Sequence, residues 1–500
     1  MKNAILALAL TSLSLAPFNG AGAAEPELKF DPNVSASPAP AEKKEDFKYG
    51  EKPLAKFGND STYFKLGGYG SMRFSTDTAQ GIHDTFTFRR FVLTTDAKIA
   101  SRFRIYSELE FERFRKIELE REVIAEDGIE IAQEIEGTNQ SEIAMEQVWF
   151  ELEFANYIRL RGGGVLVPIG RFNINHDDNV WNLPRRPLVD RGVPVLPTTS
   201  AWDELGFGLN GDFELGEKSK LDYQIYVVNG AVLDAEVEEV LKVSNSPDER
   251  SELELEGEFG ISTGTFSQDI KTAKAVTGRV AFSPVLGHEI GLSGYWGRYT
   301  PSYLPSKSLT IFGFDWLSTF GNFDIEAEYV LTHFSGLDDV LNNFAEVAGR
   351  TEAEVEDEFS PDLESVVKMK TSGLASTKQG YWVELRYHFR PDFLTKSWFG
   401  RHFSDPQLIP VVRWEQAFLS GLVQDFQAEN GATTVLDKED RFVNRLTAGL
   451  AFRLNPLAVF HTAYEFTWTN SGKPLADVTN YLPTLNDKNH SFMFGAAFGF

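Results

Sequence analysis

The last ten residues of the chain alternate between two faces. One face carries Phe492, Phe494, Ala496, Phe498 and Phe500, and the other carries mainly small or flexible residues. Strict alternation of this kind is the period-2 signature of a β-strand. A soluble sheet would place these phenylalanines in a core and would not usually end on one. The last ten residues therefore predict a strand whose apolar face lies in an environment other than the core of a soluble protein.

The same alternation recurs along the chain, for example at 103–111, 148–154, 323–331 and 442–454. No strong helical layer is available to cover so many apolar strand faces. A lipid-facing exterior around a polar, water-filled lumen accounts for both faces of each strand. A closed barrel also pairs every backbone group that lies in lipid. The sequence therefore predicts an all-β fold, a transmembrane antiparallel β-barrel.

The alternation and the connections between strands give a strand count. We expect about sixteen strands, an even number as in bacterial barrels, near 62–75, 85–97, 102–115, 143–154, 157–168, 203–215, 219–230, 274–283, 288–299, 308–318, 321–334, 379–390, 407–419, 441–454, 457–469 and 489–500. Short connections alternate with long ones, as periplasmic turns alternate with outer loops. The connection at 391–405 breaks this rule because it is long although a short turn is expected there.

The formal net charge of −25 is concentrated in segments that we expect to be solvated external loops, such as 118–142, 234–258 and 352–364. This charge argues against a nucleic-acid partner. Helical spacing predicts helices in two of the long loops. The apolar residues with that spacing are Leu337, Val340, Leu341, Phe344 and Val347 in one loop, and Leu233, Val237, Val240 and Leu241 in the other.

The amino-terminal end predicts export. Residues 1–24 combine Lys2, a short apolar stretch and the small residues Ala21–Ala24, which is the pattern of a secretory signal peptide. Residues 25–60 are rich in proline and read as a flexible periplasmic segment, so the barrel domain is expected at 61–500. The chain has no cysteine, which excludes disulfides and a cysteine-linked lipid anchor.

The third external connection, 168–202, differs from the acidic loops. It contains several prolines together with hydrophobic residues such as Phe172, Trp181 and Leu188, so it should be stiffer and less soluble. Such a segment should be packed, and the barrel lumen is the available place. We therefore expect the third external loop to fold into the lumen.

In this region the chain resembles the phosphate-selective porin O/P family of outer-membrane channels. The resemblance rests on the Arg89-Arg90 pair, the glycine-rich strand leading into Val167-Pro168, the loop itself and the strand entry 202–206. It implies sixteen-stranded trimers in which the third loop constricts the pore. The terminal strand likewise resembles the closing strand of bacterial outer-membrane barrels, whose last residues, here ending at Phe500, are read by the barrel-assembly machinery.

Family members that select phosphate carry lumenal arginines, and guanidinium groups suit phosphate oxygens. The candidate constriction and selectivity residues are Arg104, Arg159, Arg161, Arg171, Asp177, Asp178, Arg185, Arg186, Asp190 and Arg191. Two other readings stay open for the arginines. They can form the transverse field of a general porin, in which opposed charges orient water and solutes, or they can simply tie the loop to wall carboxylates.

We therefore expect a porin of the bacterial outer membrane that passes small ions and polar solutes, with a preference for anions or phosphate as one hypothesis. A general or cation-preferring porin and a structural or adhesive barrel with a closed lumen are the alternatives. The expected partners are outer-membrane lipid, two further copies in a homotrimer and the assembly machinery. An enzyme is disfavoured because His388 and His461 have no evident serine partner, and no cofactor or metal site is expected.

Overall fold

The computed structural model describes residues 55–59, 61–78, 84–112, 117–124, 130–137, 142–190, 195–198, 201–242, 251–264, 271–347, 363–371, 373–398, 400–403, 405–469 and 488–500. The expected signal peptide and most of the segment 25–60 lie outside these residues. Within that segment, β1 (Ala55–Gly58) pairs with the start of the next strand. None of the helices in the described part of the chain is long and apolar enough to cross a membrane.

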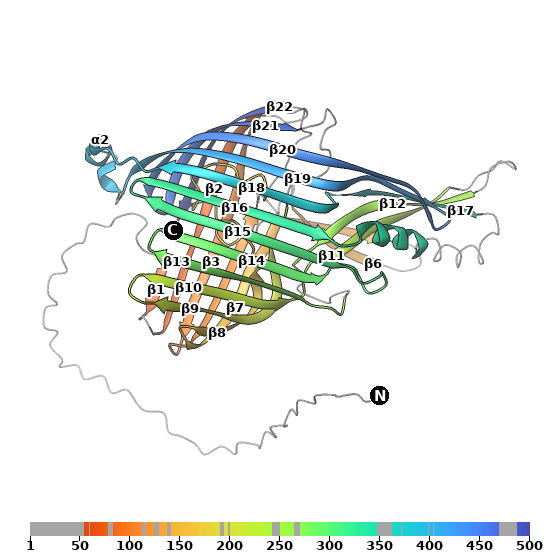
Figure 1. The fold of residues 1–500 in the computed structure, drawn as a ribbon, viewed down its shortest axis with the longest axis horizontal. Helices are drawn as coiled ribbons and strands as arrows, with labels where there is room; N and C mark the ends of the chain where they lie inside the picture. Colours follow the sequence, from red (N-terminus) through yellow and green to blue (C-terminus); the bar gives the residue numbers. More distant parts are fainter. Residues whose placement is uncertain are drawn as a thin grey trace, which may run out of the picture. The chain divides into compact units, whose positions relative to one another are not determined.

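The sheet is a closed antiparallel barrel of sixteen strands (Figure 1). The barrel strands are β2 (Tyr63–Asp77), β3 (Thr85–Ile99), β4 (Phe103–Glu112), β7 (Glu142–Ala155), β8 (Ile158–Leu166), β9 (Asp203–Leu215), β10 (Ser219–Val228), β13 (Ala275–Val285), β14 (His288–Arg298), β15 (Ser308–Phe320), β16 (Phe323–Phe334), β18 (Ala375–Tyr387), β19 (Gln407–Glu429), β20 (Ala432–Asn455), β21 (Ala458–Thr469) and β22 (Lys488–Gly499). The last strand closes the barrel on the first, with Phe494 opposite Phe74. The predicted fold class and strand count are confirmed.

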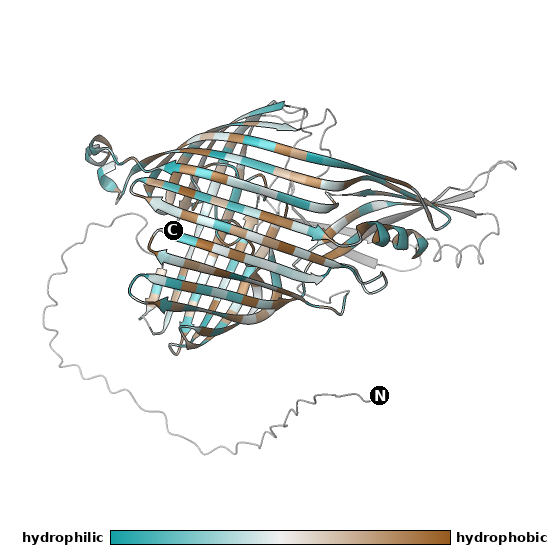
Figure 2. Ribbon diagram, viewed as in Figure 1, coloured by the Kyte–Doolittle hydropathy of each residue, from teal (hydrophilic) through white to brown (hydrophobic). Residues whose placement is uncertain are grey.

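The two faces of the barrel wall have opposite chemistry. On β22, Phe492 and Phe494 are exposed while Met493 between them is fully buried. On β4, Ile105 is exposed while Glu108 is 2% exposed. Figure 2 shows the resulting alternation of hydrophobic and hydrophilic residues along the strands. Because the apolar residues face outward and the charged residues face inward, the exterior suits lipid and the interior suits water and ions.

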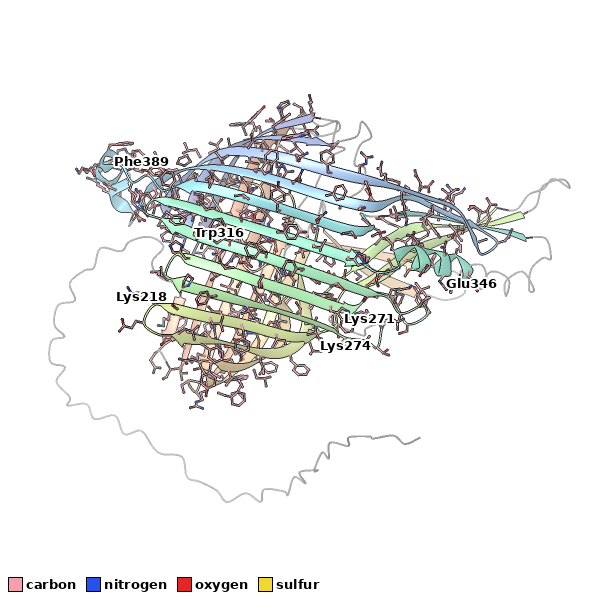
Figure 3. The ribbon with its side chains drawn as sticks, viewed as in Figure 1. Lys218, Lys271, Lys274, Trp316, Glu346 and Phe389 are labelled. Atoms are coloured by element: carbon pink, nitrogen blue, oxygen red, sulfur yellow. The ribbon has the colours of Figure 1, made fainter. Side chains whose placement is uncertain are left out.

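The connections differ at the two ends of the barrel. Short turns follow β3, β7, β9, β13, β15 and β20, as predicted. Lys218 in the turn after β9 and Phe389 after β18 mark this end in Figure 3, and Lys271, Lys274 and Glu346 mark the opposite end. The long turn between β18 and β19 holds a short helix, α2 (Asp392–Lys396), and a 3-10 turn, η1 (Gly400–His402).

The acidic segments contain more strand than the sequence predicted. The segment 118–142 includes most of a hairpin of β5 (Ile117–Ile124) and β6 (Glu130–Gly137), and 234–258 contributes to β11 (Val232–Lys242) and β12 (Ser251–Ser262). The helix expected around Leu233 to Leu241 is therefore wrong, because this stretch pairs with β12 along its length. β12 also pairs in parallel with β17 (Leu363–Thr371). The other expected helix is present at 337–347.

The hairpin of β19 and β20 is also longer than predicted. We expected strands that end at 419 and resume at 441, but the two strands continue to a two-residue turn at Asn430 and Gly431. Both turn residues have positive φ, 49° and 75°, as a tight hairpin turn requires. The register of this pair shifts at three places between Leu419 and Ala428. Each shift displaces the alternation of inward-facing and outward-facing residues by one position. The sequence pattern therefore did not predict strands in this stretch.

Candidate functional site

The segment between β8 and β9, residues 167–202, is packed rather than solvated. Phe172 and Trp181 are buried and their ring centroids lie 4.6 Å apart. Trp181 also meets Trp382 of β18 edge to face at 5.7 Å. These aromatic contacts fix the middle of the segment against the barrel wall, since such pairs add about 0.5–1.5 kcal/mol beyond the burial of apolar area.

The first anchor of the segment is a wall carboxylate. Glu328 of β16 accepts backbone N–H groups of Arg171 and Phe172, both at 2.7 Å. The N–H of Gly170 donates to Ser293 Oγ of β14 at 3.1 Å. Gly170 has φ +67°, and a Cβ at this position would clash with the Glu328 carboxylate. The turn therefore needs glycine to bring its backbone close to this wall.

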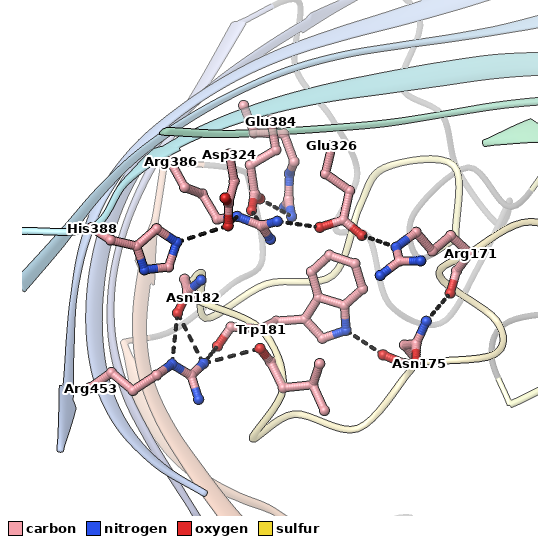
Figure 4. Close-up of polar contacts among 12 residues, drawn as sticks. Arg171, Asn175, Trp181, Asn182, Asp324, Glu326, Glu384, Arg386, His388 and Arg453 are labelled. Carbon is pink, nitrogen blue, oxygen red and sulfur yellow. Dashed lines mark hydrogen bonds and ion pairs between the residues drawn. The ribbon is translucent and has the colours of Figure 1, made fainter. Parts of the chain in front are cut away.

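The side chain of Arg171 forms a second connection to the same wall (Figure 4). Its Nε donates to Glu326 at 2.6 Å. Its Nη1 donates to Glu289 at 2.9 Å. Glu326 also binds Arg386 of β18 at 2.6 Å. Both carboxylates are thus paired with guanidinium groups through charge-assisted hydrogen bonds.

The third anchor is Arg453 of β20, which holds the segment through its backbone carbonyls. The guanidinium donates to the carbonyl oxygens of Asn179, Val180 and Trp181 at 2.9, 3.0 and 3.1 Å. It also donates to Asn182 Oδ1 at 2.9 and 3.1 Å (Figure 4). One buried arginine therefore satisfies acceptors that the irregular backbone would otherwise leave unpaired.

The segment also reaches the other side of the barrel. Asp178 accepts from Ser71 of β2 at 2.6 Å and from Arg89 of β3 at 3.2 Å. In the order of the closed sheet, β2 and the β14 strand of Ser293 are eight strands apart in either direction. A segment that contacts both walls must cross the barrel interior.

Electrostatics inside the segment follow from these contacts. Burial alone would raise the pKa of Asp178, but Arg89, Arg90 and Arg186 hold it well below its usual range. Burial would lower the pKa of His176, but Glu146 and Asp177 raise it to about 9. Both residues are therefore favoured in their charged forms next to partners of opposite charge.

Three of the candidate arginines lie on the wall strands, and in the described chain their ion pairs are with carboxylates of the wall. Arg104 pairs with Asp96 at 2.7 Å, and Arg159 and Arg161 pair with Asp212 and Glu151 at 2.5 and 2.6 Å. Their positions near the starts of β4 and β8 place them toward the short-turn end. In the described chain, carboxylates of neighbouring strands already neutralise them.

The expected residues on the segment itself come closer together. Arg185 reaches Glu465 of β21 at 3.4 Å, and Arg186 lies 3.7 Å from Asp178 and 3.8 Å from Asp190. Asp177 lies 3.8 Å from His176 Nε2. Arg191 lies outside the described residues.

Several charged residues at this site were missing from the sequence-based set. A small enclosed cavity beside the segment is lined by Arg73, Arg89, Arg185 and Arg186, with Asp178 as the carboxylate among its lining residues. Further wall residues that contact the segment are Arg413, Glu415, Arg453 and Glu465. The sequence feature that could have identified them is their position on the polar face of the alternating strands. That signal says which side a residue faces but not which loop it meets.

Comparison with known proteins gives distant matches. No family model matches the chain. An uncharacterized protein of Aquifex aeolicus (strain VF5) is 26% identical over 166 residues, 33% of this chain and 32% of that protein, so the match spans about a third of the relative's length. Solved structures that align are Salmonella typhi OmpF in complex with daunomycin (12% identity, TM-score 0.47, covering 89% of this chain and 100% of that one), an anion-selective porin from Comamonas acidovorans (10%, 0.45, 88% and 100%) and in-vitro folded OmpT, an outer membrane protein of Vibrio cholerae (10%, 0.44, 89% and 99%).

The geometry of the chain itself fixes its class. A closed antiparallel barrel of sixteen strands with an apolar exterior and a charged interior is the architecture of bacterial outer-membrane barrels. The chain folds as a porin-like β-barrel of the bacterial outer membrane.

Proposed function

We propose that the protein is a porin, a water-filled channel for passive diffusion of ions and small polar solutes, with the segment 168–202 as its constriction. The observation that carries this proposal is the path of the segment from Ser293 on β14 to Ser71 on β2. A segment pinned to opposite walls narrows the passage through a barrel without needing to close it. The charged wall around it supports a hydrated route.

The constriction charges support a finer proposal, a preference for anions, with phosphate as the candidate solute of the family that the sequence resembles. Four guanidinium groups and one carboxylate line the cavity beside the segment, and the Arg73 Nε and Arg89 Nη2 atoms there have no hydrogen-bond partner among the described residues. Charges at the narrowest point are screened less than charges at the mouth, where the Debye length is ~10 Å at 0.1 M salt. The charges at the constriction should therefore decide the ion preference, despite the net negative charge of the whole chain.

A general porin is the second candidate, and a specific observation favours it. Of the arginines that the sequence singled out, each one in the described chain lies within 4.0 Å of a carboxylate. Paired charges produce a transverse field and little net potential along the pore. In this alternative the channel sorts solutes by size and polarity, and discriminates weakly between ions.

We propose a channel rather than a barrel enzyme because the histidines lack a catalytic arrangement in the described chain. His388 Nε2 lies 2.8 Å from Asp324, and His288 Nδ1 lies 3.0 Å from Ser318 Oγ. The carboxylate and the hydroxyl thus meet different imidazoles. Acyl transfer would need both on one imidazole.

The proposal includes three partners: outer-membrane lipid, two further copies in a homotrimer, and the barrel-assembly machinery. Phe500 supports the last of these. Its N–H and carbonyl pair with Gly68 of β2 at 2.9 and 3.1 Å, and its ring stacks on Phe91 at 5.9 Å. The terminal residue therefore lies at the seam where the barrel closes.

Planar-bilayer recording of the purified protein tests the proposal. Step-like conductance would support a porin, and its absence in folded, heat-modifiable protein would favour the closed structural barrel. The reversal potential under a KCl gradient then separates the two selectivity proposals. Anion preference that grows at high salt would support the arginine constriction, and cation preference at molar salt would contradict it.

A further inference from the structure

Three potential metal ligands from three separate elements meet inside the barrel. Glu108 comes from β4, Glu146 from β7 and His176 from the constriction segment. One donor atom of each lies within 4.8 Å of the other two, and all three residues are buried, at 2%, 6% and 2% exposure. Asp177 brings a fourth oxygen, Oδ1, to 3.8 Å from His176 Nε2.

The orientation of the imidazole is fixed by its other nitrogen. His176 Nδ1 lies 3.0 Å from the backbone carbonyl oxygen of Asn173. A carbonyl can only accept, so Nδ1 must carry a proton and donate. This is the arrangement by which backbone carbonyls orient metal-binding histidines. In the neutral imidazole the Nε2 lone pair then faces the Glu146 carboxylate at 3.4 Å.

Two lone pairs at this distance repel each other, so a positive centre must lie between them. It is either a proton on Nε2 or a bound cation. The 3.4 Å separation matches two ligands of a tetrahedral ion whose bonds are about 2.0–2.1 Å long, because such ligands lie about 3.4 Å apart. The Oδ1 atom of Asp177 is itself buried and has no hydrogen-bond partner among the described residues.

The charge balance favours a cation over a single proton. In the described chain, Arg90 is the guanidinium that contacts Glu110, Glu112 and Glu146, at 2.8, 3.9 and 3.6 Å. Among the described residues, Glu108 accepts hydrogen bonds from neutral donors, Gln147 at 2.6 Å and Tyr106 at 3.3 Å. Five carboxylates, those of Glu108, Glu110, Glu112, Glu146 and Asp177, thus face Arg90, Arg186 and the His176 imidazole. Even with His176 protonated the carboxylates outnumber these cationic groups, and a divalent ion in place of the Nε2 proton would offset the remaining negative charge.

We propose that Glu108, Glu146 and His176, with Asp177 as a fourth ligand, form a binding site for a divalent transition-metal ion of the Zn²⁺ type. One imidazole with carboxylate oxygens suits such an ion better than Mg²⁺ or Ca²⁺, which prefer oxygen ligands alone. The Asp177 side chain is 38% exposed overall, although its Oδ1 atom is buried. The bound ion would join the constriction segment to β4 and β7, a part of the wall where it lacks the anchors described above.

The test uses the untagged, folded full-length protein in detergent and ZnCl₂ alone. Isothermal titration calorimetry should give one saturable site per chain, with MgCl₂ and CaCl₂ at least tenfold weaker. His176→Gln and Glu146→Gln should each weaken zinc binding at least tenfold. His288→Gln, at a histidine of β14 that contacts Ser318, is the matched control and should bind as the wild type does. Zinc X-ray absorption should show nitrogen and oxygen ligands with one imidazole, and lose the imidazole signal in His176→Gln.

Folding is checked by heat-modifiable mobility, because Glu146→Gln also removes a contact to Arg90. If that variant does not fold, Glu108→Gln, whose partners are neutral donors, replaces it. Saturable zinc binding that these substitutions abolish would support the site. Absence of saturable binding to the folded wild type, or binding that His176→Gln leaves unchanged, would overturn it and leave the imidazolium–carboxylate pair. Neither outcome depends on whether the barrel conducts.

Discussion

Replacing Arg453 by methionine should release the constriction segment while leaving the barrel closed. Methionine keeps part of the volume of the side chain but removes all of its donors. Five hydrogen bonds to residues 179–182 are lost. The barrel strands keep their backbone pairing because β20 remains bonded to β19 and β21. The substitution therefore acts mainly on the segment, and on the wall it removes the hydrogen bond from Arg453 to the carbonyl oxygen of Pro456 in the turn after β20.

The size of the effect follows from these contacts. A hydrogen bond that involves a charged group contributes about 1.5–3 kcal/mol. The five bonds share one guanidinium and are not additive. We therefore take the free energy of about two such bonds, roughly 3–6 kcal/mol. Each 1.4 kcal/mol changes an equilibrium about tenfold, so a loss of 3 kcal/mol raises the detached population on the order of 100-fold.

Single-channel recording at 1 M KCl measures this effect. Arg453→Met should raise the mean conductance or add frequent transitions to a higher level. Arg159→Met is the matched control, because it removes the same charge from a residue that pairs with Asp212 and Asn210 and has no hydrogen bond or ion pair to the described residues of the segment. If the two variants have the same conductance and the same gating, Arg453 does not hold the constriction and the reasoning fails.

Three further predictions concern the turn, the terminus and the charges. Gly170→Ala should destabilise the anchored turn by about 1–2 kcal/mol from the positive φ alone, and the clash of the new Cβ with the Glu328 carboxylate should add to this. Gly216→Ala is the control, since Gly216 also has positive φ but nothing lies within 4 Å of a Cβ there. Equal melting temperatures of the two variants would refute the anchor. Deletion of Phe500 should reduce assembled protein in outer-membrane fractions by removing the pairing at the seam, and normal levels would contradict this. Changing Arg185 and Arg186 together to glutamine should reduce anion preference in reversal-potential measurements, and an unchanged reversal potential would assign the preference to other residues.

The sequence predicted the barrel because one physical rule governs every strand. Lipid outside and water inside demand alternation, and the rule acts on each strand separately. The strand near 103–111 shows this, since Ile105 faces outward and Glu108 inward as predicted. The rule fails where the environment changes. β11 lies beyond the barrel wall and pairs with β12. The spacing of its apolar residues is therefore not set by contact with lipid, and it resembled that of a helix.

The candidate site was harder to predict because it depends on pairing across the barrel. The composition of the segment 168–202 indicated packing, and the structure places Trp181 against Trp382 of β18. Arg453, however, meets the segment across more than 270 residues of sequence. No local pattern distinguishes this arginine from Arg159, whose hydrogen-bond partners among the described residues lie on the neighbouring strand β9. The partner of each inward-facing charge follows from the closure of the barrel.

We propose that the segment crossing the barrel interior sets the size of a conducting pore. The most direct measurement is the single-channel conductance of the wild type and of a variant lacking residues 177–192. This deletion removes the Arg453 contacts and Asp178 but keeps the anchor at Glu328. We predict that both proteins conduct and that the deletion raises the conductance several-fold. Equal conductance in a folded, heat-modifiable variant would contradict the claim.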